Sequence, residues 1–222
     1  MRQNRKILLL GAGGHCMSVL DSLLALNLYS DIGIIDKVYT ENVKSHYSTN
    51  ISGVPIIGAD DDLDRLYKEG FTDAFITVGS LGDVSIRRKL YKKIKNIGFN
   101  IPNIIDVSSI VSKYTTLGEG NYIGKNAVIN GGSDIGNCTI INSSATIEHE
   151  CIIGDFVHVS PGGILCGNVN INANTHIGAG SIVKQGLTIG SNTMIGMGSV
   201  VISNISDNKT VFGNPCREVK YE

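Results

Sequence analysis

The sequence predicts two parts, an N-terminal α/β domain and a parallel β-helix after it. Three observations support this division. Aliphatic residues recur at every sixth position from Val111 to Val201. Before that repeat, short apolar runs alternate with helical stretches, and the first run, Lys6 to Leu10, leads into a glycine-rich turn. We therefore expect a Rossmann-like domain over residues 1–103 and a β-helix over residues 104–222.

The period of six excludes the common alternatives. No face of an α-helix repeats every six residues, and a half-buried strand alternates every two. A chain that turns a corner after each short strand satisfies the pattern, and three hexapeptides then form one triangular coil. The aliphatic positions are Val111, Leu117, Ile123, Ile129, Ile135, Ile141, Ile147, Ile153, Val159, Leu165, Ile171, Ile177, Val183, Ile189, Ile195 and Val201.

The repeat also predicts which residues lie together. Val111 and Val201 are 90 residues apart, which is five coils of 18 residues. Residues 18 apart should stack at the spacing of parallel strands, about 4.8 Å. Small residues four positions after many of the aliphatic ones, such as Ala127, Ala145 and Gly163, suit tight corners.

The first hundred residues follow a different pattern. After the strand Lys6–Leu10 we expect a helix from about residue 15 to 28 and a second strand from Ile32 to Ile35. A polar loop from about Lys37 to Ser52 follows, in which His46 is most simply a solvated residue. The remaining elements are expected as a short segment at 54–57, a helix near 62–69, a strand at 74–78 and a helix at 85–97.

The glycine turn, Gly11-Ala12-Gly13-Gly14, is a candidate nucleotide site. It presents backbone N–H groups at the start of a helix, where a phosphate could bind, and Asp36 follows at the end of the second strand. The third glycine of the dinucleotide fingerprint is replaced by Cys16, so the turn does not predict NAD binding. The alternative is a tight turn without a ligand.

Composition restricts the function further. The formal net charge is −1, which does not indicate nucleic acid or an anionic membrane as a partner. We find no apolar stretch of membrane-spanning length and no signal-peptide pattern, so a cytoplasmic location without membrane insertion is expected. The five cysteines show no metal-binding spacing, and no metal site is expected.

His149 is the candidate catalytic residue. It lies at an outward turn position between Glu148 and Glu150. A carboxylate beside an imidazole fixes its tautomer and makes it more basic, as a general base requires. Spacing alone leaves open that His149 is a surface residue among acids.

His158 lies half a coil after His149, on a different face of the same chain. If both serve one site, that site lies between subunits, and a triangular prism packs most naturally as a homotrimer. Gly167 should stack above His149 and could direct its N–H at a group beside the imidazole. His176 should stack above His158, and the sequence does not show whether it contributes.

The chain resembles a family of acetyltransferases. The Ile/Val-Gly repeats are similar to the left-handed β-helix of hexapeptide acyltransferases. Gly11-Ala12-Gly13-Gly14-His15, Ser144 to Cys151 and Ile153 to Ser160 resemble bacterial enzymes that acetylate nucleotide-linked 4-amino-sugars, and sialic acid O-acetyltransferases share the two-domain plan.

The resemblance implies roles for particular residues. It implies that His149 is the general base with Glu150 as its partner, and that His158, Gly167, Ala179 and Met197 bind acetyl-CoA. The nucleotide-sugar would contact Gly13, Gly14, His15, Asp36, Lys37 and Gly79. The segment from Ser80 to Arg87 is longer than the turn expected in this family.

The resulting expectation is acetyl-CoA-dependent N-acetylation of a nucleotide-linked sugar, most simply a UDP-4-amino-4,6-dideoxy sugar, in surface-glycan biosynthesis. The same machinery acting on a hydroxyl, as in O-acetylation of sialic acid, is the alternative. A nucleotide-binding module on a non-catalytic β-helix is a second alternative, which the acid-flanked His149 and its register with Gly167 disfavour.

Overall fold

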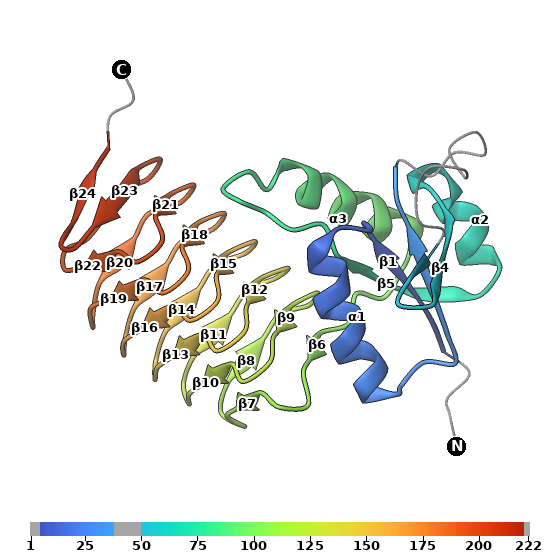
Figure 1. The fold of residues 1–222 in the computed structure, drawn as a ribbon, viewed down its shortest axis with the longest axis horizontal. Helices are drawn as coiled ribbons and strands as arrows, with labels where there is room; N and C mark the ends of the chain where they lie inside the picture. Colours follow the sequence, from blue (N-terminus) through green and yellow to red (C-terminus); the bar gives the residue numbers. More distant parts are fainter. Residues whose placement is uncertain (1–4, 38–49, 220–222) are drawn as a thin grey trace. The chain divides into compact units, whose positions relative to one another are not determined.

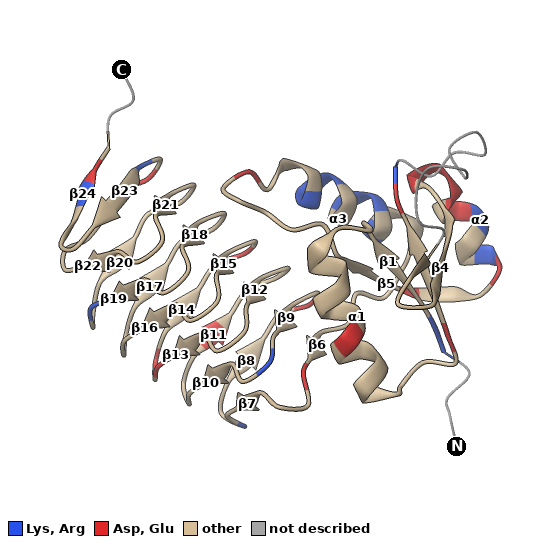
Figure 2. Ribbon diagram, viewed as in Figure 1, with Lys and Arg blue, Asp and Glu red and all other residues tan. Residues whose placement is uncertain are grey.

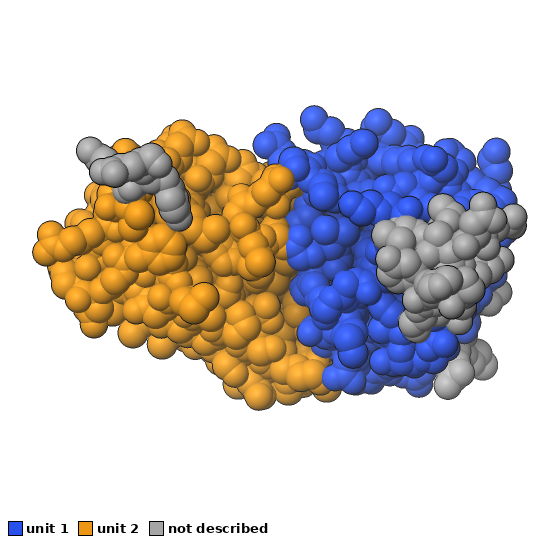
Figure 3. Space-filling model, turned by 45° about the horizontal axis from the view of Figure 1, so that its top comes forward, with its two compact units in different colours: residues 1–79, 85–102 blue, residues 80–84, 103–222 orange. Residues whose placement is uncertain are grey.

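A computed structural model describes residues 5–37 and 50–219. Residues 38–49, which include most of the expected polar loop and His46, lie outside the described residues. The chain divides into two compact units, shown in different colours in Figure 3. Unit 1 comprises residues 1–79 and 85–102, and unit 2 comprises residues 80–84 and 103–222.

Unit 1 is built on a sheet with the strand order β3-β4-β2-β1-β5. Its strands are β1 (Lys6–Leu10), β2 (Asp31–Ile35), β3 (Asn50–Ile51), β4 (Val54–Gly58) and β5 (Phe71–Ile76). β1 is parallel to β2 and β5, β2 is parallel to β4, and only the short β3 runs antiparallel to its partner among these described strands. The apolar run Ile7–Leu10 is fully buried, as a central parallel strand requires.

In the described part of unit 1, α1 (Gly14–Leu26) connects β1 to β2, α2 (Leu63–Lys68) connects β4 to β5 after a 3₁₀ turn, η2 (Asp60–Asp62), and α3 (Ser85–Ile97) follows β5. Asn27 caps the C-terminus of α1, because its left-handed backbone lets its N–H donate to the carbonyls of Leu23 and Leu24. α3 has the bounds expected from the sequence. It buries Leu90 and Ile94, and Figure 2 shows the basic residues gathered along it.

β5 begins at Phe71, three residues before the strand that the sequence predicts. The difference arises because β5 contains a buried carboxylate, Asp73, which interrupts the apolar pattern. Asp73 accepts hydrogen bonds from Tyr29 Oη at 2.9 Å and Asn100 Nδ2 at 3.1 Å, and it pairs with Arg5. These partners come from three separate segments. They compensate the desolvation of a charged group within a strand, which a local sequence pattern does not reveal.

Unit 2 contains the β-helix, whose coils are visible as repeated turns in Figure 1. Each coil contributes one two-residue strand to each of three sheets, in which successive coils pair in parallel; only β24, at the C-terminal end of the described chain, runs antiparallel to its neighbour β23. We call them the β7 sheet (β7, β10, β13, β16, β19, β22), the β8 sheet (β8, β11, β14, β17, β20) and the β9 sheet (β6, β9, β12, β15, β18, β21, β23, β24).

From β6 to β22 the strands recur every six residues, and β23 and β24 follow them. Their bounds are β6 (Ile104–Ile105), β7 (Ile110–Val111), β8 (Thr116–Leu117), β9 (Tyr122–Ile123), β10 (Val128–Ile129), β11 (Asp134–Ile135), β12 (Ile140–Ile141), β13 (Thr146–Ile147), β14 (Ile152–Ile153), β15 (His158–Val159), β16 (Ile164–Leu165), β17 (Asn170–Ile171), β18 (His176–Ile177), β19 (Ile182–Val183), β20 (Thr188–Ile189), β21 (Met194–Ile195), β22 (Val200–Val201), β23 (Thr210–Gly213) and β24 (Cys216–Glu218).

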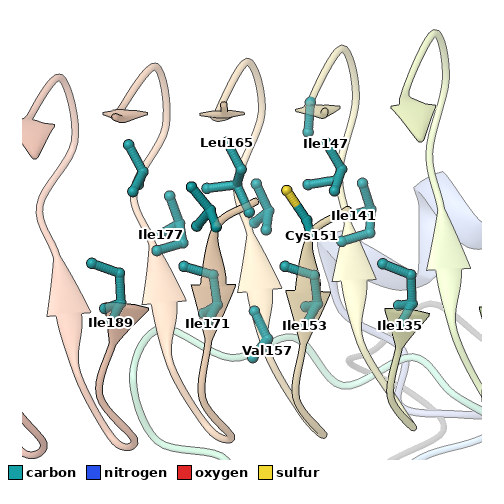
Figure 4. Close-up of a cluster of buried hydrophobic side chains, with 14 of the residues drawn as sticks. Ile135, Ile141, Ile147, Cys151, Ile153, Val157, Leu165, Ile171, Ile177 and Ile189 are labelled. Atoms are coloured by element: carbon teal, nitrogen blue, oxygen red, sulfur yellow. The ribbon is translucent and has the colours of Figure 1, made fainter. Parts of the chain in front are cut away.

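The second residue of each two-residue strand points into the prism. From Ile123 to Val201 these residues, all expected from the sixfold repeat, are at most 1% exposed. Figure 4 shows part of this column of stacked isoleucine, valine and leucine side chains. The first residue of each strand points outward, so the outward rows of the three sheets determine what the β-helix can bind.

Candidate active site

Successive coils place residues 18 apart at equivalent positions, as the sequence predicts. Thr146 pairs with Ile164 and Ile147 with Leu165 in the β7 sheet. The turn after β13 therefore lies one coil from the turn after β16. His149 and Glu150 are in the first of these turns and Gly167 is in the second.

His149 is held by the carboxylate of its neighbour. His149 Nδ1 lies 3.1 Å from Glu150 Oε2, and the two side chains are 54% and 70% exposed. A carboxylate only accepts hydrogen bonds, so Nδ1 carries the proton. Nε2 is then the basic nitrogen of the neutral ring, on the side away from Glu150.

Gly167 makes room for this imidazole. A Cβ atom at Gly167 would lie 2.5 Å from both Nε2 and Cε1 of His149, closer than carbon atoms can pack. The ring thus lies directly against the glycine backbone. The Gly167 N–H donates no hydrogen bond within the described ranges, so it is available beside the basic nitrogen.

The backbone of Glu150 has the left-handed conformation that recurs in the turns of the β-helix. Its φ is +59°, in the left-handed region that favours glycine and asparagine. The equivalent positions one coil away are indeed Gly132 and Asn168. Cys138, Ser144 and Phe156 hold the same left-handed conformation in nearby turns, so this backbone conformation belongs to the turns of the β-helix and is not particular to Glu150.

Two residues that the sequence did not indicate support the turn. Asn130 Nδ2 donates to Glu148 Oε2 at 2.9 Å, and Ser133 Oγ donates to the Glu148 carbonyl at 2.9 Å. Asn130 is 18 residues before Glu148. The coil period could therefore have predicted this pair.

The other residues expected to bind acetyl-CoA lie at a different corner. His158 begins β15 in the β9 sheet, and its side chain points outward. Ala179 and Met197 occupy equivalent exposed turns between the β9 and β7 sheets, where the Gly198 N–H bonds to the Ala179 carbonyl at 2.8 Å. One chain therefore brings His149, Glu150 and Gly167 together, and groups His158 with Ala179 and Met197 elsewhere on the prism.

In unit 1 the glycine turn packs tightly on one side and is open on the other. A Cβ at Gly11 would meet Val78 at 2.6 Å, whereas Cβ atoms at Gly13 and Gly14 would meet nothing within 4 Å. The Ala12 N–H donates to Asp36 Oδ2 at 2.8 Å. Asp36 thus fixes the turn, and the adjacent Lys37 is exposed.

Gly79 lies beside His15, since a Cβ at Gly79 would be 3.7 Å from His15 Cβ. Two residues that the sequence did not indicate hold this region. Thr77 Oγ1 donates to the Gly11 carbonyl at 2.6 Å, and the buried Arg87 donates to the carbonyls of Ile76 and Val78. The expected substrate residues of unit 1 therefore surround the ends of β1, β2 and β5.

Across residues 5–37 and 50–219, no group of three or more His, Cys, Asp or Glu is arranged to hold a metal ion. The same ranges contain no helix with the length and apolarity of a membrane span.

Comparisons with known proteins agree with this architecture. Residues 6–94 match the PglD N-terminal domain family. The acetyltransferase domain of PglB from Neisseria gonorrhoeae FA1090, solved with acetyl coenzyme A, is 34% identical, with 98% of this chain and 100% of that chain covered and a TM-score of 0.88. A His-to-Asn variant of perosamine N-acetyltransferase from Caulobacter crescentus, solved with CoA and GDP-perosamine, is 30% identical, with 97% of both chains covered and a TM-score of 0.88. WeeI from Acinetobacter baumannii AYE, at 24% identity, 97% and 100% coverage and a TM-score of 0.84, shares the fold.

These matches define the class of protein. The chain belongs to the hexapeptide-repeat nucleotide-sugar acetyltransferases, which combine an N-terminal α/β domain with a left-handed β-helix and use acetyl-CoA as the acetyl donor. The expected fold and the expected enzyme class, a sugar acetyltransferase, are confirmed.

We predict that Gly167→Ala lowers turnover about 10²-fold, because the added Cβ displaces the His149 ring and a small misplacement of a reacting group has a cost of this order. Steady-state acetyl transfer would measure the loss. Gly131→Ala is the matched control. Its Cβ would meet Ser112 Oγ at 3.3 Å and Tyr114 Cβ at 3.7 Å, without touching His149, and should preserve most of the activity. Normal turnover in Gly167→Ala would contradict the placement of the imidazole.

Proposed function

We propose that the protein transfers the acetyl group of acetyl-CoA to the amino group of a nucleotide-linked amino-sugar. A UDP-4-amino-4,6-dideoxy sugar is the expected acceptor, and surface-glycan biosynthesis is the expected context. The observation that carries the proposal is the His149 imidazole, bonded to Glu150 through Nδ1 and packed on Gly167 through Nε2 and Cε1. The perosamine enzyme, solved with CoA and a GDP-linked sugar, supports this substrate class.

His149 acts as the general base in this reaction. The acceptor nitrogen attacks the thioester carbonyl, and His149 Nε2 takes the proton that the nitrogen loses. The Gly167 N–H stabilises the oxyanion of the tetrahedral intermediate. When the C–S bond breaks, CoA leaves as a thiolate and is protonated, and the acetyl group remains on nitrogen. Glu150 orients the ring and stabilises its protonated form.

Unit 1 binds the nucleotide-sugar in this proposal. Gly13 and Gly14 offer backbone N–H groups at the start of α1, where a diphosphate would be favourably placed. His15 and Gly79 border the same turn, while Asp36 and Lys37 follow β2. Unit 2 carries the acetyl transfer.

The proposed active unit is a homotrimer. In it, the acetyl-CoA that reacts beside His149 of one subunit is bound by His158, Ala179 and Met197 of the neighbouring subunit. Two observations support this arrangement. Ala179 and Met197 lie in turns that lead into strands of the β7 sheet, whereas His149 lies in a turn that follows a strand of this sheet. That sheet also exposes an outward apolar row, with Ile110, Ile164 and Ile182 at 66%, 36% and 38% exposure, which suits contact with another subunit. Packing this row against a second chain would bring a donor corner to each His149. The proposed location of this trimer is the cytoplasm.

We expect His149→Ala to lower kcat by about 10²–10⁴-fold, because this is the usual contribution of a general base. Glu150→Gln should cost less, since the amide oxygen still accepts a hydrogen bond from Nδ1 but carries no charge. Circular dichroism and gel filtration would check folding and assembly. Near-normal turnover in a folded His149→Ala variant would refute the role of His149.

The acceptor class is tested with matched pairs of sugars. We expect a nucleotide-linked 4-amino-sugar to have a much higher kcat/KM than the same sugar without its nucleotide, because unit 1 supplies binding energy only to the former. Sialic acid should be a poor acceptor. Equal kcat/KM for the free and nucleotide-linked sugars would contradict the substrate class, and faster transfer to sialic acid would favour O-acetylation.

A further inference from the structure

The Ser80–Val84 segment belongs to the β-helix unit although it lies between two elements of unit 1 in the sequence. Ser80 and Val84 are buried. Gly82 has a φ of +92°, and a Cβ at this position would lie 2.6 Å from Met194 Cε on β21. The segment is thus folded onto the outward row of the β9 sheet, where His158, His176 and Met194 follow one another in successive coils.

The segment contacts His158 through a backbone carbonyl. Ser80 O lies 2.9 Å from His158 Nδ1. A carbonyl oxygen only accepts hydrogen bonds, so His158 Nδ1 carries the proton, and Nε2 of the neutral ring is an acceptor. Asn142 Nδ2, an amide donor, lies 3.4 Å from Nε2, which agrees with this assignment.

His176 limits the rotation of the His158 ring. The two imidazole centroids are 4.8 Å apart with an interplanar angle of 82°, so the rings pack edge to face. His176 is only 6% exposed, and its Nε2 lies 3.1 Å from Ser160 Oγ. Burial lowers the pKa of His176, against an opposing effect of the Ser80 backbone, so the ring is neutral at neutral pH.

We propose that the Ser80 carbonyl and the His176 ring are positioning elements that hold His158 in its Nδ1–H tautomer, with Nε2 directed to accept an N–H of the pantetheine arm of acetyl-CoA in place of the long 3.4 Å contact from Asn142 Nδ2. The inference deepens the proposed function, because it rests on the assignment of His158 to the donor. Pantetheine contains two amide groups, so it offers the N–H that an unprotonated Nε2 can recognise. A His158 with the proton on Nε2 would present a donor instead.

The tautomer can be read without any activity. Two-bond ¹H–¹⁵N correlation spectra of protein labelled with ¹⁵N-histidine distinguish protonated from unprotonated ring nitrogens, and the His158→Gln variant assigns the His158 signals by their loss. We expect the wild-type protein at pH 7.5 to show His158 protonated on Nδ1 alone. Protonation on Nε2, or on both nitrogens, would overturn the proposal even if acetyl transfer proceeds as proposed.

Two variants test the positioning elements. His176→Ala removes the ring and should raise the KM for acetyl-CoA about tenfold with kcat nearly unchanged, the pattern of lost donor binding. His176→Phe keeps the edge-to-face packing and should restore most of the affinity. Asn170→Ala is the control, because Asn170 has the equivalent outward position on β17, in the β8 sheet of the same coil.

Gly82→Ala tests the segment itself. The new Cβ meets Met194 in a left-handed backbone, so the segment should shift and the Nε2–H form of His158 should appear. Gly70→Ala is its control, with φ +94° and nothing within 4 Å of the added Cβ. An unchanged His158 tautomer in both Gly82→Ala and His176→Ala would overturn the positioning roles. A changed tautomer with an unchanged KM for acetyl-CoA would overturn the link to the donor.

Discussion

Parallel backbone pairing between successive coils is the constraint on which the candidate site depends. The Thr146 N–H bonds to the Gly163 carbonyl and the Glu148 N–H to the Leu165 carbonyl, each at 2.9 Å. This ladder fixes the separation of residues 18 apart at one strand spacing. It places Gly167 against His149, and it places His176 against His158. A slip of one residue would reverse every inward and outward side chain, so the buried aliphatic column and the site share one register.

The rigid coil also explains how an unfavourable turn is maintained. Glu150 holds a left-handed backbone because the ladder fixes both sides of it. Its own N–H bonds to the Gly131 carbonyl at 3.1 Å, and the Asn168 N–H bonds to the His149 carbonyl at 2.8 Å. Gly167 leaves space for the imidazole, because a Cβ at this position would lie 2.5 Å from the ring. The turn therefore presents a carboxylate–imidazole pair on a backbone that the ladder fixes.

The sequence predicted the features that follow from periodicity and missed those that depend on backbone groups. The sixfold repeat predicted the phase of the coils, and its 18-residue consequence predicted that Gly167 stacks on His149. The bounds of α3 were also predicted, because its apolar positions repeat helically. The contact between the Ser80 carbonyl and His158 was not predicted, since a main-chain oxygen has no signature in the sequence. Arg87 was missed for a related reason: its partners are the carbonyls of Ile76 and Val78.

The central claim is that the His149 imidazole and the Gly167 N–H flank the reacting carbonyl. A crystal structure with acetyl-CoA and an unreactive acceptor analogue tests this claim most directly. The account predicts the thioester oxygen about 2.7–3.1 Å from Gly167 N, the range for an oxyanion-hole donor. It also predicts the acceptor nitrogen within hydrogen-bond reach of His149 Nε2, about 2.6–3.2 Å. A thioester bound at another turn of the β-helix, with His149 facing only solvent, would contradict it.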